Sequence, residues 1–281
     1  MNYFSKYIVC IFFVFAINAP LFCRSNAYIW LEQYDSAQTI VNRIPLPDRY
    51  KRLKVDTGSF EDWLRNLPLK EHNSPVFLYN DEKKSNQSAH FRVVDIDIGE
   101  NDLQQCADAI IRLRAEYFWS NGEYDDIHFN FTNGDNAEYR KWIDGNRPIV
   151  DGDKVKWKKT AAVDSSYYGF KDYLTKVFMF AGSYSLSREL EPVPNIDEIR
   201  IGDIFIEGGF PGHAVIVVDM AIDTVLGDKV FLLAQSFMPA QDVHILKNPM
   251  DSELSPWYDI EFGDTLYTPE WIFNKRDLKR F

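Results

Sequence analysis

Cysteine is scarce in this chain, which has three in 281 residues: Cys10, Cys23 and Cys106. The first two lie within an N-terminal segment that we expect to be removed, so the mature protein keeps one thiol and forms no intrachain disulfide. An unpaired cysteine is either a small buried apolar side chain or a reactive group. Composition alone does not choose between these two readings of Cys106.

Long hydrophobic runs are also missing, apart from Tyr7–Ala19. Lys6 before this run and the small residues Ser25–Ala27 after it predict a secretory signal peptide over residues 1–27. We therefore expect an exported protein, periplasmic or extracellular. A lipoprotein attached through Cys23 is the weaker alternative, because a large aromatic residue precedes that cysteine. No other stretch has the roughly 20 apolar residues of a membrane span, so none is expected.

Basic residues are outnumbered, with 31 Lys and Arg against 42 Asp and Glu and a net charge of −11. Signal-peptide removal takes away Lys6 and Arg24 and no acidic residue, which changes the charge from −11 to −13 (−11 − 2). Nucleic acids and anionic membranes are bound mainly through clustered positive charge. The sequence therefore predicts neither as a partner.

Motifs for metals and cofactors are missing as well. His72, His90, His128 and His244 show no spacing typical of zinc ligands. The chain also has no Gly-x-Ser-x-Gly nucleophile elbow and no Walker-type phosphate loop. We expect no metal and no cofactor.

The residues that follow the signal peptide, 28–281, are long enough for one large domain. We expect an N-terminal extension over residues 28–100 and a core over residues 101–281. Helical patterns cover residues 59–67 and 102–119, and also residues 166–190 with a break at Gly182. Strand patterns cover residues 76–79, 90–98, 201–207, 213–220 and 230–236.

Cys106 lies near the start of the amphipathic pattern at Asp102–Trp119. Asp102 is the expected N-cap, with Gln105 three residues later as in a capping box. This assignment places Cys106 in the first turn or just after it. A helix N-terminus stabilises a nearby thiolate, so a reactive cysteine is a natural reading beside that of a buried one.

His213 opens a β-branched strand, and the following strand pairs with it in a predicted hairpin. In this register the residue numbers of two opposite positions add up to about 448–450, which puts Gln235 opposite or diagonal to His213. Its amide can orient the imidazole. Asp219 is on the same strand but about 20 Å away by strand rise, too far to serve. The alternative is a structural histidine at a strand edge.

Four short segments resemble, in the same order, the CHAP amidases and NlpC-type cell-wall peptidases: 105–108, 202–206, 212–217 and 234–236. The resemblance implies an α+β papain-like fold, in which an N-terminal helix carries the cysteine and packs on an antiparallel sheet. It also implies cleavage of amide bonds in peptidoglycan. The segments 232–241 and 268–271 resemble more closely an uncharacterised family of secreted bacterial proteins, defined as a domain of unknown function.

By that resemblance, Cys106 is the nucleophile, His213 the general base and acid, and Gln235 the residue that orients the imidazole. The backbone N–H of Cys106, with Gln105 nearby, would bind the oxyanion. Two features depart from the pattern. His213 follows Cys106 by 107 positions (213 − 106), which implies a large insertion. Gln235 stands where these families have His, Asn or an acid, and an amide supplies no negative charge.

The leading hypothesis is therefore an exported cysteine amidohydrolase or peptidase that acts on cell-envelope (peptidoglycan) peptides. The alternative is a non-catalytic binding or structural protein of the envelope with the same fold. An open cleft, with the Cys106 sulfur within about 4 Å of a His213 ring nitrogen, would favour the enzyme.

Overall fold

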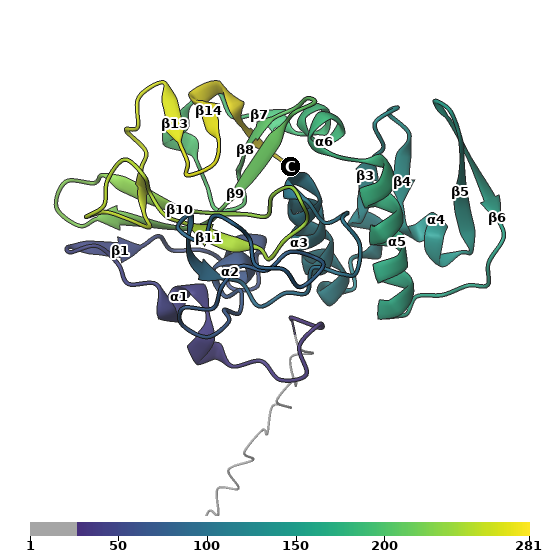
Figure 1. Cartoon of the computed structure of the whole chain (residues 1–281), viewed down its shortest axis with the longest axis horizontal. Coiled ribbons are helices and arrows are strands. Elements are labelled where there is room, and N and C mark those ends of the chain that lie inside the picture. The colour runs from purple at the N-terminus through teal and green to yellow at the C-terminus, as the bar shows by residue number, and fades with distance from the viewer. Residues whose placement is uncertain (1–26) are drawn as a thin grey trace, which may run out of the picture.

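A computed structural model describes residues 27–281 and shows a mixed α+β architecture around a large antiparallel sheet (Figure 1). The predicted signal peptide lies almost wholly outside the described residues. Among the helices within residues 27–281, none is long and apolar enough to cross a membrane.

The sheet is centred on β9 (His213–Asp223), which is buried along nearly all of its length. The strand order is β2-β11-β10-β9-β8-β15-β7, and β1 and β12 pair in addition with β9 and β10. A strand with both faces covered needs apolar residues throughout, as its β-branched sequence supplies. The other strands are β1 (Tyr50–Arg52), β2 (His90–Val93), β7 (Glu191–Pro192), β8 (Ile204–Glu207), β10 (Lys229–Gln235), β11 (His244–Leu246), β12 (Tyr258–Asp259) and β15 (Leu278–Arg280).

Helix α3 (Cys106–Asn121) packs against β9 and β10, as the sequence predicts for the cysteine-bearing helix. The predicted cap is wrong: Gln105 is the N-cap and Cys106 is the first helical residue. Asp102 instead accepts hydrogen bonds from Ala240 N at 2.7 Å and from Gln105 Nε2 at 3.0 Å. This contact with a residue far along the chain ties the helix entry to the loop after β10.

The long segment between α3 and β8 carries a group of elements, from β3 to α5, that lies to one side of the sheet (Figure 1), whereas its β7 pairs within the sheet. Ser166 caps α5 by accepting from Gly169 N, and the predicted break at Gly182 separates α5 from α6. This segment also contains two short hairpins, β3–β4 and β5–β6. Its elements are β3 (His128–Asn130), β4 (Asn136–Glu138), α4 (Tyr139–Ile143), β5 (Asn146–Asp151), β6 (Lys154–Lys159), α5 (Tyr167–Phe180) and α6 (Ser183–Glu189).

The first third of the described chain contributes two strands to the sheet: β1 pairs with β9, and β2 pairs with β11. The predicted Ser59-capped helix is confirmed as α2 (Phe60–Arg65), whereas residues 76–79 form isolated bridges in place of the predicted strand. The remaining short elements are α1 (Ile40–Arg43), β13 (Thr265–Tyr267), β14 (Ile272–Asn274) and the 3-10 turns at Ser36–Gln38, Tyr124–Asp126, Ile196–Glu198 and Lys275–Asp277.

Asp219 joins this first third to β9. Its fully buried carboxylate accepts from Arg52 Nε at 2.6 Å and from Arg65 Nη2 at 2.7 Å. Arg52 belongs to β1 and Arg65 ends α2, so one carboxylate fixes two separate elements on the sheet. The distance argument that excluded Asp219 from the histidine site thus agrees with its actual partners.

Asp219→Asn should therefore destabilise the protein strongly, by about 3–5 kcal/mol, because it leaves two guanidinium groups facing a neutral amide in a buried site. Urea denaturation measures the change in the free energy of unfolding. The control is Asp172→Asn on the exposed face of α5, which should change it by less than about 0.5 kcal/mol. Similar stabilities for the two variants would contradict the role of Asp219.

Candidate active site

Cys106 begins α3 and is 5% exposed. Burial raises the pKa of its thiol to about 11, and the neighbouring Asp108 carboxyl acts in the same direction. Backbone hydrogen bonding from Ala107 and Ala214 opposes the shift without overcoming it. Ala214 adjoins His213, so the thiol lies at the start of β9. The expectation that the helix N-terminus makes this cysteine a thiolate is not met in the resting structure.

His213 is the first residue of β9, and its ring is fully buried. Three aromatic rings surround it: Phe237 at 4.7 Å between centroids, Trp271 at 5.3 Å and Phe273 at 5.9 Å. This burial lowers the pKa of His213 to about 4, against a smaller opposing effect of its hydrogen bond to Gln235. The imidazole is therefore neutral at pH 7.

Gln235, the last residue of β10, accepts through Oε1 from the Nε2–H of His213 at 2.8 Å. A bulge follows Leu232, after which Ala234 pairs with Ile216, so Gln235 lies diagonal to His213 as the hairpin register predicts. Because an amide oxygen only accepts, we assign the ring proton to Nε2. The other nitrogen, Nδ1, is buried and has no hydrogen-bond partner among the described residues.

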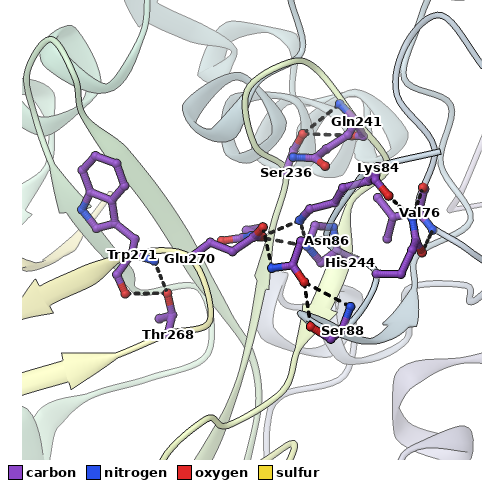
Figure 2. A network of polar contacts seen from close by, with 12 residues as sticks. Val76, Lys84, Asn86, Ser88, Ser236, Gln241, His244, Thr268, Glu270 and Trp271 are labelled. Atoms are coloured by element: carbon purple, nitrogen blue, oxygen red, sulfur yellow. Dashed lines mark hydrogen bonds and ion pairs between the residues drawn. The ribbon is translucent and has the colours of Figure 1, made fainter. Parts of the chain in front are cut away.

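A buried polar network continues behind Gln235 (Figure 2). The side-chain nitrogen of Gln235, Nε2, donates to Glu270 Oε2 at 2.8 Å and lies 3.3 Å from His244 Nε2. Lys84 forms an ion pair with Glu270 and lies 3.5 Å from His244 Nε2. Asn86 donates to the second oxygen of Glu270 at 3.2 Å. The histidine site is thus one end of a chain of charged and polar groups.

The sequence analysis missed Glu270, Lys84 and His244 as members of this site. Glu270 lies within residues 268–271, which carried only a family resemblance, and His244 was considered only as a metal ligand. No group of three or more His, Cys, Asp or Glu residues suited to a metal ion occurs in the described part of the chain.

Gln105 is placed next to the thiol in the sequence, but its side chain is engaged elsewhere. Its amide donates to Asp102, and its backbone N–H donates to Asp108 Oδ2 at 3.2 Å. The first N–H groups of a helix have no intrahelical partner. In this structure the backbone N–H groups of Cys106 and Ala107 interact with the Cys106 thiol and lower its pKa.

The site is closed in this structure. Exposed fractions are 5% for Cys106, 0% for His213 and 1% for Gln235, which differs from the expected open cleft. A cavity of about 810 Å³ lies at the other end of α3, lined by Tyr117 and Asn121 among others. That end is about 22 Å from Cys106 along the helix, so this cavity is separate from the site.

The chain matches the model of a family described as Domain of unknown function (4846) over residues 40–280. The chain belongs to this family. Neither the curated proteins nor the solved structures gave a match. The resemblance to an uncharacterised family is thereby confirmed, and the match to this domain of unknown function includes both ends of the site, Cys106 and Glu270.

The burial of His213 predicts how its pKa responds to Phe237→Ala. Opening the ring to water should raise the pKa from about 4 toward 6.5, which NMR of the imidazole Cε1–H resonance measures. Phe178→Ala, a partly buried phenylalanine on α5, is the control. A wild-type midpoint near 6.5 would contradict the account.

The same shift has a consequence for stability. The folded pKa lies below the unfolded one, so His213 stabilises the fold above about pH 6.5 and loses this contribution as the pH falls through 4. The contribution amounts to about 3 kcal/mol. The difference in unfolding free energy between wild type and His213→Gln should shrink by about that amount between pH 7 and pH 4.

The raised pKa of Cys106 predicts slow alkylation. At pH 7 iodoacetamide should label it at least tenfold more slowly than free cysteine, because the thiolate is rarer and the sulfur is buried. The rate should still be rising at pH 10. A plateau below pH 8, measured by mass spectrometry of the intact protein, would show a stabilised thiolate and contradict this prediction.

Proposed function

We propose that this protein is an exported cysteine hydrolase with a papain-like site, which cleaves amide bonds in cell-envelope peptides. One observation carries the proposal: His213 is hydrogen-bonded through Nε2 to Gln235 and keeps a buried Nδ1 without a hydrogen-bond partner among the described residues, and the backbone of its neighbour Ala214 hydrogen-bonds to the thiol of the first residue of α3. That residue is Cys106. A nucleophile, a base and a residue that orients the base are the parts that such chemistry needs.

In the proposed reaction, Cys106 Sγ attacks the amide carbonyl while His213 Nδ1 takes the thiol proton. The C–N bond then breaks, and the imidazolium returns that proton to the leaving amine. Water attacks the resulting thioester, giving one proton to His213. The C–S bond then breaks as the carboxylic acid forms, and the imidazolium of His213 returns the proton to the Cys106 thiolate. The N–H groups at the start of α3 stabilise the oxyanion of both steps.

The pKa values fit general-base chemistry better than a preformed ion pair. A thiol pKa of about 11 and an imidazole pKa of about 4 keep both groups neutral at rest. Charge then develops only as the proton moves during attack. Substrate entry requires the closed site to open, and the loop before His213 and the loop after Gln235 expose Phe210 (85%) and Met238 (41%), respectively, at the surface.

The cell-envelope substrate rests on different support. The predicted signal peptide directs the chain out of the cytoplasm, and the segments around Cys106, His213 and Gln235 resemble those of CHAP and NlpC-type enzymes. Peptidoglycan contains amide bonds of the kind that a thiol nucleophile attacks. The acidic charge of the chain fits a substrate other than nucleic acid.

The closure of the site favours one rival, a non-catalytic envelope protein that keeps the arrangement without turnover. A buried cysteine on α3 and a buried neutral histidine on β9 are also a stable core packing, and His213 Nδ1 has no hydrogen-bond partner among the described residues. The two functions differ in whether fragments are released.

Incubation of the mature protein with purified peptidoglycan tests the proposal, with mass spectrometry of the soluble fragments. Cys106→Ala should abolish release, because no thioester can form. Gln235→Ala should lower kcat/KM about threefold to tenfold, the value of a lost neutral hydrogen bond. Thermal unfolding confirms that each variant is folded. Equal release by wild type and Cys106→Ala would contradict the role of Cys106 as the nucleophile, and no release by either would favour the rival.

A further inference from the structure

We propose that Glu270 is a positioning residue for His213: it acts through the side-chain amide of Gln235 and supplies the negative charge that the amide lacks. The catalytic part of this inference rests on the proposed function, whereas the positioning part stands on geometry alone. In many cysteine–histidine pairs a carboxylate contacts the imidazole directly. Here the side chain of Gln235 lies between the imidazole of His213 and the carboxylate of Glu270.

The orientation of the Gln235 amide is the first step of the argument. Its oxygen lies 2.8 Å from His213 Nε2, and its nitrogen lies 2.8 Å from Glu270 Oε2. A flipped amide would bring its oxygen against the carboxylate and its N–H₂ against the imidazole. His213 would then need a lone pair on Nε2 and its proton on Nδ1, where a base for Cys106 needs the lone pair.

His244 holds the amide in the same orientation. Its Nδ1 lies 2.8 Å from the backbone oxygen of Asp242, which only accepts, so Nδ1 carries the proton. Nε2 of His244 is then an acceptor, 3.3 Å from the Gln235 nitrogen. Two acceptors thus face the N–H₂ end of the amide, and one of them is a carboxylate.

Lys84 and Asn86 keep that carboxylate in place. Lys84 is 7% exposed and pairs with one oxygen of Glu270, while Asn86 donates to the other. Figure 2 shows the Glu270 carboxylate directed toward Lys84, Asn86 and His244. The positive charge of Lys84 disfavours the imidazolium of His213, and the Glu270 carboxylate forms an ion pair with that lysine.

This arrangement makes an unexpected prediction for Gln235→Glu. An acid at this position occurs in the resembled families and would be expected to strengthen the base. Here it would place a second carboxylate about 3 Å from that of Glu270, with no N–H to bridge them. The variant should therefore lower turnover by at least tenfold.

Nitrogen-15 NMR of the imidazole side chains tests the proposal, because the two tautomers have different shifts. Wild type and the exposed control Glu253→Gln should show His213 as the Nε2–H form alone. Glu270→Gln keeps the shape but removes the obligate acceptor, so both tautomers should be detected. Its kcat on a peptidoglycan fragment should fall about tenfold, with KM changed less than twofold.

Retention of a single Nε2–H tautomer and of wild-type kcat in folded Glu270→Gln would overturn the proposal. If that variant unfolds, Glu270→Asp keeps the charge but withdraws the carboxylate from Gln235, and it should give the same tautomer mixture. Inactivity of the wild-type protein would refute the proposed function alone. The tautomer of His213 would then still decide whether Glu270 positions it.

Discussion

The antiparallel pairing of β9 and β10 is the interaction on which the site depends. It brings the first residue of one strand, His213, to the last residue of the other, Gln235, and buries both where water cannot satisfy them. Buried polar groups must then find partners within the protein, and each one recruits the next. The hydrogen bonds run from His213 to Gln235 and on to Glu270 and Lys84. One buried atom of the imidazole, Nδ1, is left without a partner among the described residues.

Burial also decides the chemistry available to the resting protein. It raises the pKa of the thiol to about 11 and lowers that of the imidazole to about 4, so desolvation outweighs the field of the helix N-terminus. In the proposed reaction, such a site stays neutral until a substrate supplies a carbonyl whose developing charge the helix end can stabilise. The aromatic rings around His213 contribute by excluding water.

Local patterns in the sequence predicted much of this fold. The strand of His213, the hairpin with Gln235, and the helices capped by Ser59 and Ser166 all follow from short-range periodicity and capping. The helix start at Asp102 was misplaced because that carboxylate pairs with Ala240, 138 residues away. Glu270 is 35 residues from Gln235 and 186 from Lys84. Sequence periodicity indicates helices and strands, but it gives no sign of contacts between segments that are so far apart in the chain.

The central claim is that Cys106 acts as a nucleophile with His213 as its base. The most direct measurement is capture of the thioester. The protein is mixed with a stem-peptide fragment, quenched in acid and digested. Mass spectrometry then gives the mass of the peptide that contains Cys106. The account predicts a transient mass increase equal to the acyl part of the fragment, absent from His213→Gln at the same time point. Equal fragment cleavage by wild type and Cys106→Ala, with no adduct on Cys106 of the wild type, would contradict it.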